Sequence, residues 1–322
     1  MMLRIAILDD YQDVALGLAD WAALGTDAEV VRFGHNLATE DEAAAALADF
    51  DVLCLMRERM PLPASLIARL PRLKLVSVTG ARIRTIDMAA ATAQSITICH
   101  TAAGESRLGV PELAWGMIFA LARNIPQEDA TIRAGGWQTG LGEALGGKVL
   151  GLMGLGKLGA RMALIARAFE MEVIAWSQNL TDARAAEVGA RRVDKAGLFA
   201  GADVVSLHLI LSDRNRGIVG APELAAMKPG AILINTSRGP LVDEPALIAA
   251  LQEGRIRAGL DVFDREPLPA DHPLRHAPNT VLTPHIGYVT QNAYAEFFRD
   301  TVENILAWRA GAPVRVLAAP AP

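Results

Sequence analysis

The chain has 322 residues and a formal net charge of −5 at pH 7, and this length suggests two domains. No basic run or face stands out, which argues against nucleic acid or an anionic membrane as the main partner. The N-terminus lacks a signal-peptide pattern, and no apolar run reaches the ~18 residues of a membrane span. Cys54 and Cys99 lie in apolar runs and are expected as buried free thiols, and no Cys/His group has metal-ligand spacing. These features predict a cytoplasmic α/β protein without a bound metal.

Residues 1–99 alternate short apolar runs with helical segments. Strands are expected at Leu3–Leu8, Glu29–Phe33, Asp51–Met56, Leu73–Val78 and Ser95–Cys99. Helices are expected at Val14–Leu24, Thr39–Leu47, Pro63–Leu70 and Ile86–Ala93. Thr39 has the position of an N-cap, with Glu42 three residues on. The alternation predicts a parallel sheet covered by helices on both faces.

The middle of the chain differs in composition. Pro111–Arg123 is apolar at helical spacing and is too hydrophobic for an isolated surface helix. We therefore expect it to bridge two domains or to meet a partner subunit. Ile125–Gly147 is looser and contains Trp137, which predicts an extended arm.

A second alternation begins at Lys148. After a first strand at Val149–Met153, strands are expected at Glu172–Trp176, Asp203–Leu209, Ala231–Asn235, Arg257–Leu260 and Thr280–Leu282. Helices are expected at Ala160–Phe169, Ala183–Val188, Pro222–Met227, Glu244–Gln252 and Asn292–Arg309. The chain thus predicts two doubly wound α/β units.

The first strand of this second unit leads into the glycine-rich turn GLGKLG at residues 154–159. Strand, glycine turn and helix form the context that a dinucleotide fingerprint requires. Gly154 allows a tight turn, Gly156 lets the backbone approach a pyrophosphate, and Gly159 lets the helix pack closely on the strand. The helix N-terminus offers unpaired N–H groups to phosphates. The turn alone also fits a glycine-rich loop without a ligand, and the flanking elements favour the ligand.

Three later strands in succession are followed by polar side chains. Arg238 follows Ala231–Asn235, the acids Asp261, Asp264 and Glu266 follow Arg257–Leu260, and His285 follows Thr280–Leu282. Ligands of open α/β sheets bind beyond the carboxyl ends of the strands. A guanidinium suits a planar carboxylate, a histidine donates a proton near neutral pH, and a carboxylate fixes its tautomer. Arg238, Glu266 and His285 therefore predict reduction of a 2-oxo acid.

These segments resemble the D-isomer-specific 2-hydroxyacid dehydrogenase family. The resemblance rests on GLGKLG (154–159), SLHLILSDRNRG (206–217), MKPGAILINTSRGPLVDEPAL (227–247), GLDVFDREPLP (259–269) and TPHIG (283–287). It implies a Rossmann-type cofactor domain, residues 100–288, inserted into a flavodoxin-like substrate domain, residues 1–99 plus 289–322. It also implies a homodimer built on residues 100–147. Our own hypothesis is that Trp137 in this region reaches the other subunit's active site.

The resemblance also implies the roles of single residues. Arg238, Glu266 and His285 would be catalytic, and Asp261 would hold the nicotinamide carboxamide. The substrate carboxylate would be gripped by backbone N–H groups of SVTGAR, with Thr79 and Gly80 the best matches, and the loops near Met56–Arg59 and Thr79–Arg82 would line the pocket. The cofactor would be bound by Gly154, Leu155, Gly156, Lys157, Leu158, Gly159, Ser177, His208, Thr236, Ser237, Arg238, Asp261, His285 and Gly287.

The sequence departs from the family pattern at two places. NAD users carry an acid after the second strand of the cofactor domain, where this chain has Ser177. A 2′-phosphate is then no longer repelled, although the nearest arginine that follows, Arg184, lies in the next helix. The cofactor is therefore expected to be NAD(P), with NADP slightly favoured. Ile210 stands where a proline is usual, and the backbone of His208 rather than its ring is expected near the cofactor.

The leading hypothesis is an NAD(P)-dependent reductase of small 2-oxo acids, of glyoxylate or hydroxypyruvate type. With NADPH as the cofactor, it is expected to run toward the D-2-hydroxy acid. The alternative is a dinucleotide-sensing binding protein, since the family contains co-repressors that keep the same catalytic residues. A catalytically inactive paralogue is disfavoured by the intact Arg238, Glu266 and His285.

Overall fold

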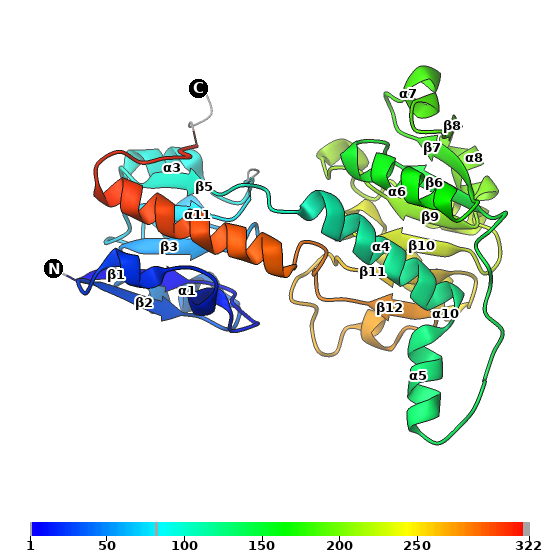
Figure 1. Ribbon diagram of the computed structural model, residues 1–322, viewed down its shortest axis with the longest axis horizontal. Coiled ribbons are helices and arrows are strands. Elements are labelled where there is room, and N and C mark those ends of the chain that lie inside the picture. Colours follow the sequence, from blue (N-terminus) through cyan, green and yellow to red (C-terminus); the bar gives the residue numbers. More distant parts are fainter. Residues whose placement is uncertain (1, 81–82, 318–322) are drawn as a thin grey trace. The chain divides into compact units, whose positions relative to one another are not determined.

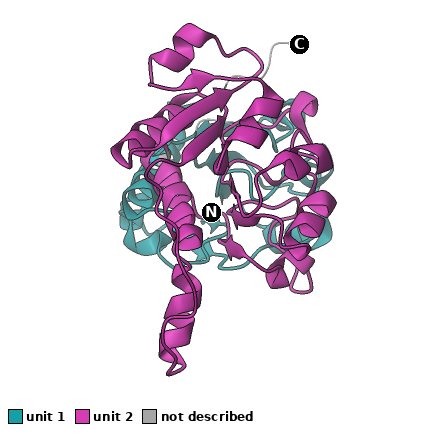
Figure 2. Cartoon of the chain, turned by 90° about the vertical axis from the view of Figure 1, so that its right-hand side faces the viewer, with its two compact units in different colours: residues 1–105, 289–322 teal, residues 106–288 magenta. Residues whose placement is uncertain are grey.

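The computed structural model describes residues 2–80 and 83–317 (Figure 1). The chain forms two compact units, Met1–Glu105 with Val289–Pro322 and Ser106–Tyr288 (Figure 2). We call them unit 1 and unit 2. The chain leaves unit 1 after Glu105, later than the expected residue 99, and returns at Val289.

Unit 1 is built on a five-stranded parallel sheet in the order β2-β1-β3-β4-β5 (Figure 1). Its strands are β1 (Leu3–Ile7), β2 (Ala28–Arg32), β3 (Val52–Leu55), β4 (Leu75–Val78) and β5 (Thr97–His100). Its α-helices are α1 (Glu40–Leu47), α2 (Ala64–Ile67), α3 (Met88–Ala93) and α11 (Gln291–Arg309). The strand order is that of flavodoxin-like folds, as the sequence predicted.

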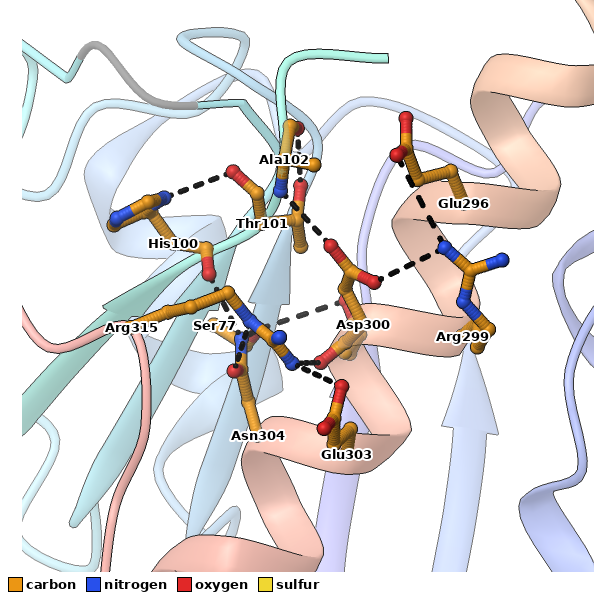
Figure 3. A network of polar contacts seen from close by, with 11 residues as sticks. Ser77, His100, Thr101, Ala102, Glu296, Arg299, Asp300, Glu303, Asn304 and Arg315 are labelled. Atoms are coloured by element: carbon orange, nitrogen blue, oxygen red, sulfur yellow. Dashed lines mark hydrogen bonds and ion pairs between the residues drawn. The ribbon is translucent and has the colours of Figure 1, made fainter.

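Helix α11 joins unit 1 through buried polar contacts as well as apolar ones (Figure 3). The side-chain N–H groups of Asn304 donate to Ser77 Oγ at 3.0 Å and to the carbonyl of His100 at 3.1 Å. Asp300 Oδ2 accepts from the backbone N–H of Ala102 at 2.9 Å. These bonds attach the returning helix to β4 and to the segment by which the chain leaves the unit.

The expected helix at Val14–Leu24 is wrong. The segment forms two short 3₁₀ helices, η1 (Ala15–Gly17) and η2 (Trp21–Leu24). The Asp10 carboxylate accepts from the backbone N–H groups of Val14 and Ala15, at 3.2 and 3.1 Å, and the Asp20 side chain caps η2. Acidic side chains that bind nearby N–H groups compete with a continuous helix for the same donors.

Unit 2 is built on a seven-stranded parallel sheet in the order β12-β11-β10-β9-β6-β7-β8. Its strands are β6 (Val149–Met153), β7 (Glu172–Trp176), β8 (Arg191–Arg192), β9 (Val204–Leu207), β10 (Ile232–Asn235), β11 (Arg257–Leu260) and β12 (Thr280–Leu282). The first six follow the strand order of dinucleotide-binding Rossmann folds. The order reverses between β6 and β9, and this switch point is where such sheets bind ligands.

Helices cover both faces of the unit 2 sheet (Figure 1). They are α4 (Ser106–Ala122), α5 (Ile125–Arg133), α6 (Lys157–Ala168), α7 (Asp182–Ala186), α8 (Lys195–Gly201), α9 (Ala221–Ala226) and α10 (Glu244–Gln252), with 3₁₀ helices η3 (Asp213–Asn215), η4 (Gly239–Leu241) and η5 (Pro273–His276). One apolar cluster joins one face of the sheet to α4, α6 and α7, and a second joins the other face to α8, α9 and α10.

Several elements of unit 2 differ from those expected from the sequence. The expected arm at Ile125–Gly147 is extended only in its second half, because Ile125–Arg133 form α5, which projects from the rest of the unit (Figures 1 and 2). The expected helix at Pro111–Arg123 begins earlier and contains Pro111 within it. Strand β8 and helix α8 were missed, since β8 is only a pair of arginines and α8 is a short helix with two glycines.

The described residues include no helix long and apolar enough to cross a membrane. Over the same residues, no group of three or more His, Cys, Asp or Glu side chains is placed to hold a metal ion. Cys54 and Cys99 are free and buried, as the sequence predicted.

Candidate active site

The glycine turn lies at the switch point of the unit 2 sheet, between β6 and α6. Gly154 has φ +104°, and a Cβ there would lie 2.6 Å from the carbonyl oxygen of His208. A Cβ on Gly159 would lie 2.2 Å from the carbonyl oxygen of Gly154. A Cβ on Gly156 would meet nothing within 4 Å. Two of the glycines are thus required by close packing, whereas the third borders open space.

Helix α6 begins directly after this open space. Its N-cap is Gly156, which has no side chain to cap the first N–H groups. Leu155 is buried and Lys157 is exposed at the first helical position. Unpaired N–H groups and the positive end of the helix dipole favour an anion at this point.

The exit of β10 is a tight turn made by Asn235. Its Oδ1 accepts from the N–H of Ser237 at 3.1 Å, and its Nδ2 donates to the carbonyl of Arg238 at 2.8 Å. Ser237 Oγ donates to the carbonyl of Leu207 at 2.8 Å, which ties this turn to the exit of β9. Thr236 Oγ1 is buried and has no hydrogen-bond partner among the residues that the structure describes. A buried hydroxyl without a partner at a ligand-binding edge is a candidate contact for a bound group.

His208 presents its backbone, not its ring, to the glycine turn, because its carbonyl is the group nearest Gly154. Its ring nitrogen Nε2 lies 2.9 Å from Ser206 Oγ. Burial lowers the pKa of His208 to about 4, so the ring is neutral at physiological pH.

Glu266 and His285 form the central pair of the site. His285 Nδ1 lies 2.5 Å from Glu266 Oε2, and both side chains are partly exposed. Glu266 Oε1 accepts from the backbone N–H of Phe263 at 2.9 Å. Burial by itself raises the pKa of Glu266, but the bond and charge of His285, the Phe263 amide and the charge of Arg238 outweigh it and lower that pKa. Glu266 is therefore held as a carboxylate against the imidazole.

Asp261 fixes the loop that carries His285. Its Oδ1 accepts from Thr283 Oγ1 at 2.6 Å and from the N–H of Ile286 at 2.7 Å, and its Oδ2 accepts from the N–H of Gly287 at 2.9 Å. These bonds flank His285, whose φ of 56° is in the left-handed region that non-glycine residues rarely adopt. Burial raises the pKa of Asp261 despite these hydrogen bonds. The sequence assigned Asp261 only to the nicotinamide carboxamide and missed this structural role.

The close approach of Gly239 to Phe263 was also missed. A Cβ on Gly239 would lie 2.1 Å from the backbone carbon of Phe263. Gly239 follows Arg238, and Phe263 precedes the loop of Glu266, so two of the predicted catalytic segments pack closely at a place that only glycine allows. The glycine directly after Arg238 was the sequence feature that could have indicated this close approach.

In unit 1, the backbone N–H groups of Thr79 and Gly80 are already paired. Thr79 donates to the carbonyl of Leu55 at 3.0 Å, and Gly80 donates to Thr101 Oγ1 at 2.9 Å. Both amides thus have partners within unit 1, and their expected role in gripping a substrate carboxylate stays a prediction. The next two residues of the predicted segment SVTGAR, Ala81 and Arg82, lie outside the described residues.

The structure thus brings Arg238, Glu266 and His285 together with the glycine turn at the carboxyl edge of one sheet. Leu155, Lys157, Leu158 and Ser177 lie on the same edge, after β6 and β7. A doubly wound sheet with this turn at its switch point defines unit 2 as a dinucleotide-binding domain.

Comparisons with known proteins agree with this class. The model of the family "D-isomer specific 2-hydroxyacid dehydrogenase, NAD binding domain" matches residues 115–287. A glyoxylate reductase of Aeropyrum pernix is 37% identical over 256 residues, which are 76% of each chain. A D-3-phosphoglycerate dehydrogenase of Methanocaldococcus jannaschii is 38% identical over 259 residues, 79% of this chain but 49% of that protein.

A solved structure, a phosphoglycerate oxidoreductase from Vibrio cholerae, has a TM-score of 0.90 and 38% identity over 97% of this chain and 100% of that one. The chain belongs to the D-isomer specific 2-hydroxyacid dehydrogenase family. It spans about half the length of the curated D-3-phosphoglycerate dehydrogenases that it matches.

Proposed function

We propose that the protein is an NAD(P)-dependent reductase of small 2-oxo acids, of glyoxylate or hydroxypyruvate type, that forms the 2-hydroxy acid, as the D enantiomer where the product is chiral. The observation that carries this proposal is the His285–Glu266 pair on the edge of the sheet that bears the glycine turn. Family membership and the named relatives support the reaction class. The relatives themselves are named for different substrates.

The residues present fit a dinucleotide. Gly156 borders open space at the start of α6, and Thr236 Oγ1 is a buried hydroxyl without a partner among the described residues. The residues that would hold the cofactor are the glycine turn, Ser177, the backbone of His208, and the residues that follow β10, β11 and β12, namely Thr236, Ser237, Arg238, Asp261, His285 and Gly287. When bound, the nicotinamide ring supplies the hydride that reduces the carbonyl carbon.

Arg238 orients the substrate. A guanidinium donates two parallel hydrogen bonds to a planar carboxylate and places its positive charge beside the carbonyl that is reduced. The turn made by Asn235 fixes the backbone on both sides of this residue.

His285 donates the proton. Its Nδ1 is held by Glu266, which leaves Nε2 as the nitrogen that protonates the carbonyl oxygen when negative charge develops there. Glu266 remains a carboxylate, fixes the tautomer and stabilises the imidazolium before transfer. Asp261 keeps the histidine loop in place.

Two further properties belong to this proposal. Ser177 replaces the acid that would repel a 2′-phosphate, which favours NADP. The chain forms a homodimer through residues 100–147, where α5 and the arm line an open groove and expose Ile132 (54%), Trp137 (74%) and Leu141 (96%). Trp137 would reach the partner's active site. Two free buried thiols fit a reducing, cytoplasmic setting.

The test is the initial rate of NADH and of NADPH oxidation, side by side, with glyoxylate, hydroxypyruvate and a bulkier 2-oxo acid. We expect turnover with at least one acid and a higher kcat/KM for NADPH. If no acid is turned over although a cofactor binds tightly, the reductase proposal fails. A dinucleotide-sensing protein then becomes the better interpretation. Light scattering after size exclusion checks the dimer.

A further inference from the structure

We propose that Arg192, on the edge strand β8, binds the adenosine 2′-phosphate of the cofactor and sets the preference for NADP. This inference rests on the proposed cofactor role of unit 2. Directly after β7, where a 2′-phosphate would bind, the sequence provides only Ser177 and a turn. Arg192 would supply the missing positive charge from a strand further along the chain.

Strand pairing brings Arg192 to the end of β7. Arg192 is in register with Ala175, and the N–H of Val193 donates to the carbonyl of Ala175 at 3.0 Å. Ser177 lies two residues beyond Ala175. Its backbone carbonyl accepts from the N–H of Leu180 at 3.1 Å, which closes a turn. Because neighbouring parallel strands lie ~4.8 Å apart and rise ~3.3 Å per residue, an arginine side chain spans this separation.

Arg192 lies on the appropriate face of the sheet. Ala175 packs in the apolar cluster that contains Met162 and Ala163 of α6. Residues paired across a sheet share a face, so Arg192 lies on the face covered by α6. The N-terminus of α6 is the proposed site of the cofactor phosphates.

The guanidinium of Arg192 extends toward the start of α7, two residues beyond the turn. Its Nη1 lies 3.6 Å from Asp182 Oδ1, and the two side chains are 47% and 82% exposed. An ion pair this long and this exposed contributes little to stability. Exchanging Asp182 for a phosphate dianion, which offers several acceptors in geometry suited to a guanidinium, is therefore favourable.

Two neighbouring arginines do not meet these conditions. Arg184, the nearest in sequence, pairs with Glu187 within the α7 segment. Arg191 is in register with Ile174, whose side chain packs on the opposite face, and it pairs with Glu172 at the start of β7 at 3.0 Å. Arg191 is thus a matched control: it is the same residue on the same strand, but on the other face and directed to the other end.

The experiment measures binding of 2′,5′-ADP and 5′-AMP, which differ only in the 2′-phosphate, by isothermal titration calorimetry. We expect Arg192→Ala to weaken 2′,5′-ADP binding roughly tenfold, corresponding to ~1.4 kcal/mol, and to leave 5′-AMP binding and the melting temperature unchanged. Arg191→Ala should change neither affinity. Asp182→Asn should tighten 2′,5′-ADP binding, because it removes the competing carboxylate.

Equal losses in the Arg192 and Arg191 variants, or no loss in either, would overturn the assignment. So would a wild-type protein that binds both nucleotides equally. The last result would leave the proposed reductase intact if NADH supports turnover, so the two proposals fail independently.

Discussion

The carboxyl edges of the two sheets differ in how they treat polar groups. In unit 2, the motif residues reach the edge as side chains, and backbone bonds on either side hold them, as Asn235 does for Arg238 and Asp261 does for His285. In unit 1, the groups expected to bind are backbone amides, and those of Thr79 and Gly80 are already satisfied within the fold. Internal hydrogen bonds fix the backbone and so position the side chains at a site. The amides that donate those bonds are then occupied within the fold.

The largest effect is expected from Arg238 in unit 2. Arg238→Ala should lower kcat/KM by about 10²–10³-fold, because removing a preorganised electrostatic group costs this much in comparable sites. Cofactor affinity should change far less, since the glycine turn is intact. Steady-state kinetics and a fluorescence titration with NADPH measure the two. A loss confined to cofactor affinity would remove Arg238 from the substrate side of the site.

Two glycines of the glycine turn allow the effect of packing on stability to be tested separately from the effect on cofactor binding. Gly159→Ala places a Cβ 2.2 Å from a carbonyl oxygen, and such overpacking destabilises by about 1–3 kcal/mol or more. Gly156→Ala meets open space, so it should leave stability nearly unchanged while weakening cofactor binding. Urea unfolding and a cofactor titration of both variants give the comparison. Equal destabilisation by the two would contradict the geometry.

In unit 1, the corresponding test is Thr101→Val. This change is nearly isosteric and removes the acceptor of the Gly80 N–H. Leaving a buried donor unpaired costs about 1–3 kcal/mol, and we expect the loss in urea unfolding. Thr92→Val, at an exposed helical hydroxyl, serves as the control. If Thr101→Val is as stable as the wild type, the Gly80 amide is not committed to the fold.

The smallest effect concerns the pH dependence of Glu266. Its pKa is lowered in the folded protein, so the carboxylate contributes stability above the unfolded pKa, ~4.3, and this contribution is lost as the pH falls through the folded value. The wild type should therefore have a higher melting temperature than Glu266→Gln at neutral pH, and the difference should shrink as the pH falls below the unfolded pKa toward the lowered folded one. A difference that is constant with pH would show that the ionised pair does not stabilise the fold.

The sequence was sufficient where a local rule decides the outcome. β7, α10, β11 and β12 have the expected bounds, and Thr39 caps α1 by accepting from the N–H of Glu42. The glycine turn was readable because Gly154 and Gly159 meet conditions that only glycine satisfies.

The sequence failed where tertiary contacts decide. Asp10 divides an apparently helical segment by binding the backbone N–H groups of Val14 and Ala15. The pairing of β8 with β7, which places Arg192, has no sequence pattern beyond two charged residues. Neither the loop-holding role of Asp261 nor the paired amides of Thr79 and Gly80 follow from motif spacing, because both depend on hydrogen bonds to other segments of the chain.

The assignment of His285 as the proton donor, with most of the cofactor held by the glycine turn, is tested most sharply by His285→Ala. Single-turnover reduction of the preferred 2-oxo acid and NADPH affinity are measured on the same preparation. We expect the rate to fall by about 10²–10⁴-fold, the value of a positioned acid, with NADPH affinity nearly unchanged. An unchanged rate would mean that the proton comes from another group and would exclude His285 as the proton donor.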